Sequence, residues 1–303
     1  MTFEVVPQGA FDLETQVSHF GGWPRRGEAI AMAFPVEGWN SSAAAVLRQQ
    51  GDAIRGEIHG AAEADAERAW RQALSTLSLD VDGRGFQDVG RRDPVIGRLQ
   101  AEYHSLRPVL FHSPYEAASA FLIGHRITIQ QTRRLRQKMA EEIGAAISVD
   151  GEKVFAFPGP RALLEMESFP GVAAVKIERL HAAARSALEG TLDRARLRAL
   201  PEAEALEQLR TLPGVGEFFA QGILMRGAGL VDAITDDDLT PRAIELLYGL
   251  RERPDRAAIL ERAEGWRPFR MWAAVLLNVW VRSQPAEVLG RRRIRDRAKP
   301  PSR

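Results

Sequence analysis

Residues 212–216 read Leu212-Pro213-Gly214-Val215-Gly216 and lie between two short segments, 205–210 and 218–226, whose apolar residues recur at helical spacing. This order predicts two helices joined by a Pro-Gly-x-Gly turn. Such a hairpin turns backbone N–H groups outward at a helix N-terminus, where they suit a phosphate. Glycine also lets a phosphate approach the backbone closely. The stretch therefore predicts a phosphate-binding hairpin, and a plain helix connection with glycines for close packing is the alternative.

Three consecutive aspartates, Asp236, Asp237 and Asp238, follow the hairpin by about two dozen residues. Carboxylates beside a phosphate-binding turn weaken its affinity for an anion by repulsion, so at least one of them is expected to serve chemistry. One of Asp236 and Asp237 is expected to cap the following helix, which we predict to begin near Leu239. A solvated acidic loop is the alternative for the whole triplet.

The composition limits the class of protein. The chain has 303 residues, which allows two or three domains, and its 45% of apolar residues can form a sizeable core. The formal net charge is only +1, so no overall field decides the partner. There is no cysteine, which excludes disulfides, cysteine-ligated zinc and iron–sulfur clusters. The chain has no signal-peptide pattern and no apolar run of membrane-span length, so we expect a soluble cytoplasmic protein without a membrane partner.

The sequence pattern changes near residue 93. Before it, short strands at 29–34 and 53–58 and a helix at 66–74 predict a small α+β domain. After it, the chain reads essentially as helices, and Ser113 and Pro114 mark the start of one of them. The predicted fold class is therefore mainly α. The α+β domain is predicted to span residues 1–92. One helical domain spans 117–230, and a second combines 93–116 with 231–285. Residues 286–303 form a basic tail that is expected to be disordered.

Three blocks of sequence, in this order and spacing, match a known family. They are the hairpin at 212–216, the segment 232–239 that ends the aspartate triplet, and Trp266-Arg267-Pro268-Phe269-Arg270. Shorter matches occur at 93–96, 106–108, 155–158 and 175–180. From about Pro94 to Trp280 the chain resembles the helix-hairpin-helix (HhH-GPD) DNA glycosylases, in particular the bacterial 3-methyladenine DNA glycosylase II type. The resemblance implies a two-lobed, all-helical glycosylase fold behind the α+β domain.

The resemblance assigns the catalytic carboxylate to Asp238. Enzymes of this kind take a base out of the stack before they break its glycosidic bond. A fixed carboxylate stabilises the positive charge that builds on the deoxyribose and orients the attacking water. The hairpin would bind double-stranded DNA through Gly214, Val215, Gly216 and Glu217. In the family, carbonyls of this turn also hold Na⁺ or K⁺, which would here be those of Arg210, Leu212 and Val215; no other cofactor is implied.

Phe218 stands where related bifunctional enzymes have the lysine that attacks the sugar and permits strand cleavage. No lysine lies between Lys176 and Lys299, so we predict a monofunctional enzyme that leaves an abasic site. Aromatic rings stack well on a cationic alkylated base. We therefore assign Phe218, Trp272 and Phe20 to the base pocket, and a position in the hydrophobic core is the alternative for each of them.

The residue that fills the gap left by the flipped base is where the chain departs from the family. The family usually has a glutamine-rich or Gln-Leu turn, and this chain has His125 and Arg126 after Gly124. By position one of them is the wedge; two surface residues on a turn are the alternative. The departure, together with Gly222 where the family often has a bulkier residue, leaves the substrate range open.

The sequence thus predicts a monomeric, nucleoid-associated DNA glycosylase of base-excision repair that acts on alkylated purines in duplex DNA. One alternative is the same fold acting on hypoxanthine, uracil or an oxidised purine. Another is a DNA-binding protein without catalysis that uses the hairpin for phosphate contact.

Overall fold

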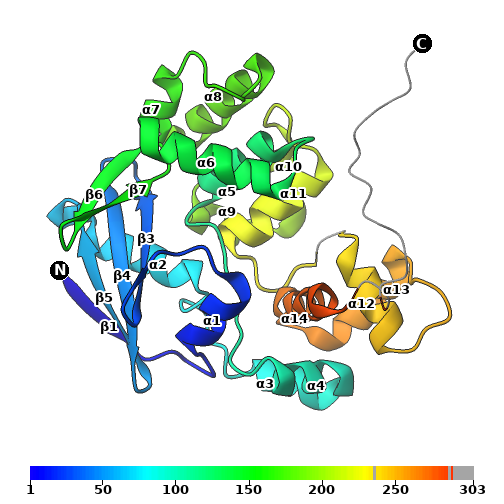
Figure 1. The fold of residues 1–303 in the computed structure, drawn as a ribbon. Helices are drawn as coiled ribbons and strands as arrows, with labels where there is room; N and C mark the ends of the chain where they lie inside the picture. The colour runs from blue at the N-terminus through cyan, green and yellow to red at the C-terminus, as the bar shows by residue number, and fades with distance from the viewer. Residues whose placement is uncertain (235–236, 286–287, 289–303) are drawn as a thin grey trace, which may run out of the picture.

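An antiparallel sheet organises the N-terminal part of the chain (Figure 1). The computed structural model describes residues 1–234, 237–285 and 288. The five strands run in the spatial order β1-β5-β4-β3-β2, over Thr2–Val5, Ala53–His59, Ser42–Gln50, Ala29–Pro35 and Arg25–Arg26. Helix α2 (Ala66–Thr76) packs on one face, where Trp70 closes over the sheet, and α1 (Leu13–Phe20) precedes β2. The predicted α+β character of this region is confirmed, although only β3 and β5 of its five strands were predicted.

A second, two-stranded sheet corrects the expectation that only helices follow residue 93. It consists of β6 (Ala145–Val149) and β7 (Glu152–Ala156), joined by Asp150 and Gly151. Both linking residues have positive φ, 51° and 82°, as a two-residue hairpin turn of type I′ requires. The hairpin packs on the other face of the five-stranded sheet, where small alanines leave room for it. The Asp-Gly pair between two alternating segments was the signal for this hairpin.

The remaining helices form two lobes around separate hydrophobic cores, which confirms the predicted two-lobed helical fold (Figure 1). The first lobe holds α5 (Pro114–Gly124), α6 (Ile129–Ile143), α7 (Pro160–Glu165), α8 (Ala174–Leu188), α9 (Arg194–Ala199), α10 (Glu202–Arg210), α11 (Glu217–Ile223) and the π-helical turn η2 (Leu224–Ala228). The second holds α3 (Phe86–Arg92), α4 (Pro94–Glu102), α12 (Leu239–Leu247), α13 (Arg256–Ala263), η3 (Glu264–Trp266) and α14 (Arg270–Ser283). Its core already includes Phe86 and Val89, so it begins before residue 93. The short η1 (Glu63–Asp65) precedes α2.

The Asp93 carboxylate connects three parts of the second lobe by hydrogen bonds. Its carboxylate caps α4 by accepting the amide of Val95 at 3.0 Å, as expected of an aspartate before a helix that starts with proline. The other carboxylate oxygen accepts the indole N–H of Trp266 at 2.8 Å and the hydroxyl of Tyr248 at 2.5 Å. Trp266 is fully buried. The Trp-x-Pro block therefore supports the lobe that carries the aspartate segment.

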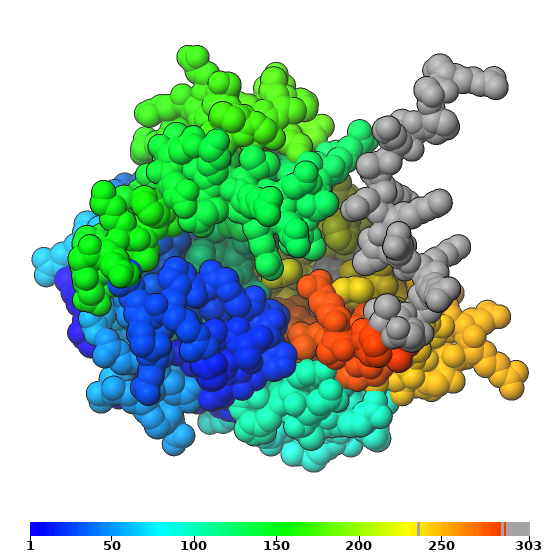
Figure 2. All heavy atoms as spheres, in the orientation of Figure 1, coloured from blue at the N-terminus to red at the C-terminus, as the bar shows by residue number. Residues whose placement is uncertain are grey.

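Figure 2 shows the surface hollowed between α1, α6 and α14, at the junction of the two helical lobes and the N-terminal domain. Among the described residues, no helix combines the length and apolar character that crossing a membrane requires.

Candidate active site

The turn at 212–216 folds as its sequence predicts. The amide of Val215 donates to the carbonyl of Leu212 at 3.0 Å, which places Pro213 and Gly214 at the two central positions of a β-turn. Gly214 has φ of 84°, which fits the third position of a type II turn. A Cβ on Gly214 would lie 2.5 Å from the Cδ of Arg179, whereas one on Gly216 would meet nothing within 4 Å. Gly214 is thus required by the backbone, and Gly216 leaves an open approach to it.

Helix α11 begins directly after this turn, and no side chain caps its N-terminus. The first amides of a helix have no partner within it, so those of Gly216 and Glu217 face outward. The amide of Val215 is engaged in the turn, which removes it from the predicted phosphate donors. The Glu217 carboxylate pairs with Arg210 at 2.8 Å, so its charge at this end of the helix is offset. The donors that remain suit an anion.

The predicted monovalent-cation site uses the carbonyls of Arg210, Leu212 and Val215. The Leu212 carbonyl already accepts one amide, which leaves it one lone pair for a cation. A carbonyl donor set of this kind fits Na⁺ or K⁺, and the site stays a prediction. Across the described part of the chain, no cluster of three or more His, Cys, Asp or Glu side chains is placed to hold a metal ion.

The turn after α5 lies beside the hairpin. The ammonium of Lys176 donates to the carbonyls of Ile123 at 2.7 Å and His125 at 2.8 Å, so α8 closes the end of α5. The His125 ring meets that of Phe219 edge-on, with the centroids 5.9 Å apart. Arg126 is exposed and has a left-handed φ of 60°. The two predicted wedge residues thus stand on a turn that a lysine from another helix holds in place.

Positive charge surrounds this turn. Burial lowers the pKa of His125, and the charges of Arg126, Arg179 and Lys176 lower it further. Arg179 also packs against Gly214 of the hairpin. The wedge turn and the hairpin therefore share one basic surface, a feature suited to a DNA backbone.

Two of the three consecutive aspartates, Asp237 and Asp238, differ in their contacts: the first caps a helix and the second is exposed to solvent. The Asp237 carboxylate accepts the amides of Leu239 and Thr240, both at 2.7 Å. Helix α12 begins at Leu239, so the predicted cap is confirmed and assigned to Asp237. Asp238 is exposed and makes no capping bond to the helix that follows it. Its rival Asp236 lies outside the described residues.

Aromatic rings line the space between the hairpin and the wedge turn. Phe218 is 52% exposed at the start of α11, and its ring centroid lies 6.1 Å from that of Phe219. Phe219 in turn lies 5.3 Å from Phe121 on α5. A Cβ on Gly222 would come within 2.4 Å of the Phe121 ring. Phe121 therefore occupies the space that a side chain at position 222 would take, a relationship between distant residues that no local sequence pattern signals.

No protein-family model matches the sequence. Over 207 residues the chain is 24% identical to a DNA-3-methyladenine glycosylase of Bacillus subtilis (strain 168), and the match covers 66% of this chain and 68% of the relative. DNA-3-methyladenine glycosylase 2 of Escherichia coli (strain K12) is 27% identical over 194 residues, covering 61% of this chain and 63% of the relative. The chain thus spans somewhat less than two thirds of the second protein.

Solved structures extend the likeness to nearly the whole chain. The 3-methyladenine DNA-glycosylase from Archaeoglobus fulgidus superposes with a TM-score of 0.75 at 19% identity, covering 93% of this chain and 98% of that one. The Clostridium acetobutylicum 8-oxoguanine glycosylase/lyase, solved with double-stranded DNA, superposes with a TM-score of 0.69 at 18% identity, covering 93% and 97%. The sequence relatives and the structural neighbours are both DNA glycosylases by name. The chain has the fold of solved helix-hairpin-helix DNA glycosylases, and the sequence matches support its resemblance to that superfamily.

Within this superfamily fold, Trp272 does not line the base pocket as predicted. Its side chain is only 2% exposed. The centroid of its ring lies 5.3 Å from that of Phe86 and 5.2 Å from that of Phe269. The guanidinium carbon of Arg107 lies 5.2 Å from the centre of the Trp272 ring. The correction has a simple cause, because Trp272 lies on the face of α14 that packs against α3 and the N-terminal loops. Phe20, at the end of α1, is half-buried against the second lobe and remains a pocket candidate.

Proposed function

We propose that the protein is a monofunctional DNA glycosylase of base-excision repair, which hydrolyses the N-glycosidic bond of a flipped-out damaged purine and leaves an abasic site. The observation that carries the proposal is that the adjacent aspartates Asp237 and Asp238 make different contacts. Asp237 is committed to the helix, and Asp238 is left exposed at the start of α12, in the superfamily that the hairpin defines. The names of the relatives and the DNA complexes among the structural neighbours support the activity.

In the proposed mechanism, the hairpin amides bind a backbone phosphate and Arg126, or His125 beside it, fills the gap left by the extruded base. Phe218 stacks on that base. As the bond to C1′ breaks, positive charge builds on the sugar, and the Asp238 carboxylate stabilises it. The same carboxylate orients the attacking water and accepts its proton. Asp237 contributes by fixing the backbone from which Asp238 projects.

The absence of strand cleavage is proposed from Phe218. A lyase step needs an amine that attacks the sugar and forms a Schiff base, and a phenyl ring supplies none. The lysine beside the wedge turn, Lys176, already donates to two carbonyls. Borohydride trapping on lesion-bearing DNA tests this point: we expect base release without a trapped covalent complex. A trapped complex would show that the enzyme is bifunctional.

Alkylated purines of the 3-methyladenine type are the first candidate substrates, because the relatives carry that name. Neutral damaged bases such as hypoxanthine are the second candidate, because His125 and Arg126 replace the turn that the family usually has at this place. Release from a panel of duplexes, each with one lesion, decides between the two classes. Binding to DNA without release of any base from the panel would instead support a DNA-binding protein without catalysis.

A further inference from the structure

The chain between the hairpin helix and Asp238 is held by contacts from other elements. After the π-helical turn η2 ends at Ala228, residues 229–234 lie outside helices and strands. We call these residues the connection. Backbone of this kind lacks the repeating hydrogen bonds of a helix or a sheet, so its position depends on the groups that its neighbours offer. Its course matters, because the chain runs from it directly to Asp238.

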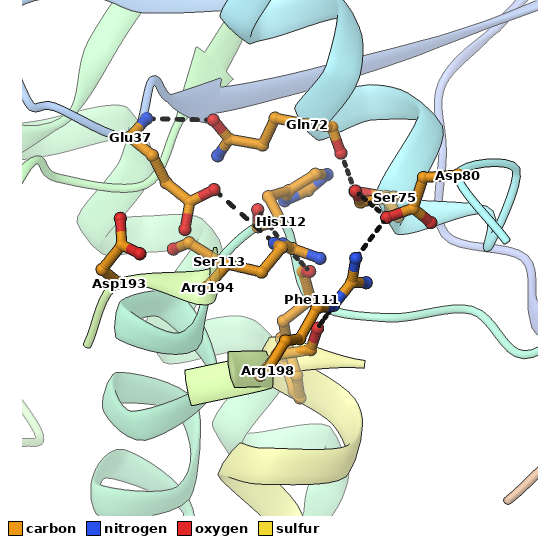
Figure 3. A network of polar contacts seen from close by, with 12 residues as sticks. Glu37, Gln72, Ser75, Asp80, Phe111, His112, Ser113, Asp193, Arg194 and Arg198 are labelled. Carbon is orange, nitrogen blue, oxygen red and sulfur yellow. Dashed lines mark hydrogen bonds and ion pairs between the residues drawn. The ribbon is translucent and has the colours of Figure 1, made fainter. Parts of the chain in front are cut away.

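Arg198 on α9 fixes the point where the connection begins, as Figure 3 shows. Its guanidinium donates to the carbonyl of Ala228 at 2.6 Å and to the carboxylate of Asp80 at 2.6 Å. Asp80 follows α2 of the N-terminal domain and also accepts the hydroxyl of Ser75 at 2.6 Å. One guanidinium therefore joins the start of the connection to both the first lobe and the N-terminal domain.

The start of α14 fixes the middle of the connection. Arg270, the first residue of this helix, donates from its Nε to one carboxylate oxygen of Asp232 at 2.8 Å and from a terminal nitrogen to the Asp232 carbonyl. Arg267 donates to the other carboxylate oxygen of Asp232. The amide of Met271 donates to the carbonyl of Val231 at 3.0 Å. The Trp-x-Pro-aromatic-Arg block and the residue after it thus hold two neighbouring residues of the connection.

The two arginines that contact Asp232 differ in their exposure. The Arg270 side chain is 10% exposed, whereas that of Arg267 is 48% exposed. A charge-assisted hydrogen bond is stronger where water and salt screen it less, so Arg270 makes the stronger of the two contacts. Its guanidinium is also a rigid planar fork, which holds the carbonyl and the carboxylate of Asp232 at the same time. Arg270 therefore fixes the orientation of this residue as well as its position.

Helix α14 supports the chain on both sides of Asp238. Before Asp238, the side chains of Ala233 and Ile234 are buried in the core of the second lobe, which α14 helps to form. After it, α12 packs on α14, where the hydroxyl of Thr240 lies 3.5 Å from the amide oxygen of Asn278. The point from which the Asp238 side chain projects therefore depends on how the chain is seated on this one helix.

We propose that Arg270 is a positioning residue for base release: it seats the connection on α14, and the seated connection places the Asp238 carboxylate at the sugar. The inference rests on the proposed function, in which Asp238 stabilises the positive charge on the deoxyribose. Since Arg198 fixes the start of the connection, its further course toward Asp238 is set by Arg270. A shift of a catalytic group by about 1 Å costs about 100-fold in rate. Arg270 touches neither the base nor the attacking water in this role.

The first experiment separates the rate of base release from DNA binding. Arg270→Gln removes the charge and the fork, and Arg253→Gln is the matched control, because Arg253 pairs with Glu245 at an exposed position of the same lobe. Single-turnover release is measured on duplexes that carry a single 7-methylguanine or hypoxanthine, and Kd is measured on a duplex with an abasic-site analogue. We expect Arg270→Gln to slow release about 100-fold and to change Kd less than about threefold. Arg253→Gln should change both quantities less than about twofold.

A conservative variant keeps the test informative if Arg270→Gln does not fold. Arg270→Lys retains the positive charge and one hydrogen bond to Asp232, but an ammonium group cannot hold the carbonyl and the carboxylate in one fixed fork. We expect this variant to release the base about tenfold more slowly than the wild type, again with little change in Kd. The melting temperature of each variant is measured, and rates are compared where all of the proteins are folded.

The second experiment asks whether Arg270 acts through Asp238. Arg270→Gln, or Arg270→Lys in its place, is introduced into Asp238→Asn, where the carboxylate that needs positioning is gone. We expect the added change to slow the residual release less than about threefold, against about 100-fold for Arg270→Gln in the wild type. A general loss of structure would instead slow release by the same factor in both backgrounds.

Several outcomes contradict the inference. Equal slowing in the two backgrounds would make Arg270 a residue of general stability, and a wild-type rate for Arg270→Gln would show that its contact with Asp232 is dispensable. A weaker Kd with unchanged release would assign Arg270 to DNA binding. Failure of the proposed function looks different: a wild type that releases neither base, nor 3-methyladenine, defeats it whatever the Arg270 variants do.

Discussion

The carboxylate of Asp237 accepts two hydrogen bonds from Thr240, one from its amide and one from its hydroxyl, each at 2.7 Å. This pairing fixes the first turn of α12 and leaves the neighbouring Asp238 outside the cap. Two adjacent carboxylates therefore have separable roles, one in stability and one in chemistry.

Substitution of Asp237 tests its role as the cap. We expect Asp237→Ala to lower the free energy of unfolding by about 1 kcal/mol, because helix amides lose their acceptor. Asp238→Ala is the matched control and should change stability by less than about 0.5 kcal/mol, as an exposed side chain with no capping bond. Urea denaturation of both variants measures the difference. Equal destabilisation by the two changes would contradict the assignment.

Lys176 is predicted to hold the wedge turn. Lys176→Met keeps the length of the side chain and removes the donors to the carbonyls of Ile123 and His125. We expect the free energy of unfolding to fall by about 1–2 kcal/mol and affinity for abasic-site DNA to fall about tenfold. Lys153→Met, at an exposed position on β7, is the control. Unchanged affinity in Lys176→Met would show that the turn does not contact DNA.

Glu116 gives the protein a predictable response to acid. It is buried beside His112, whose ring nitrogen is 2.8 Å from the carboxylate, and beside Arg136. Burial raises the pKa of Glu116, but the charges and hydrogen bonds of these two partners outweigh burial and lower the pKa from 4.5 to about 2. Because the folded pKa is lowered, this stabilisation is complete above about pH 4.5 and is lost as the pH falls toward 2.

The corresponding variant is Glu116→Gln. At pH 7 we expect it to unfold with a free energy about 2–3 kcal/mol below that of the wild type. The gap should narrow below about pH 4, where the wild-type carboxylate loses its advantage. Denaturant titrations at several pH values measure both proteins. A gap that stays constant down to pH 3 would contradict the role given to the ion pairs.

Phe218 is predicted to stack on the extruded base. Its side chain is half exposed, so truncation removes a ring that supports little of the core. We expect Phe218→Ala to cost about 1–3 kcal/mol of base stacking, which lowers the rate of base release about 10- to 100-fold. The melting temperature, measured in parallel, should change little. Base release at the wild-type rate would remove Phe218 from the pocket.

The sequence was most informative where structure is local. The turn at 212–216, the helix start at Ser113 and the cap before Leu239 are each set by neighbouring residues, and all three form as predicted. The β6–β7 hairpin was equally local, since Asp150 and Gly151 mark its turn, but the alanine-rich strands around them also fit helices. Composition alone does not distinguish a strand from a helix in segments this short.

Relationships across the fold were not predictable in the same way. Trp272 has an aromatic side chain near a motif, and only the packing of α14 shows that it belongs to the core. Phe121 fills the space above Gly222 from another helix. Each of these relationships depends on tertiary contacts, for which one sequence by itself carries no periodic signal.

The most direct test of the central claim is single-turnover base release by Asp238→Asn on a duplex that the wild type processes. The variant keeps the shape of the side chain and removes the charge that stabilises the sugar cation. We predict release slowed by about a thousandfold and a Kd for the same DNA that is unchanged or tighter, because one negative charge is lost. Base release at the wild-type rate would contradict the claim that Asp238 carries the chemistry.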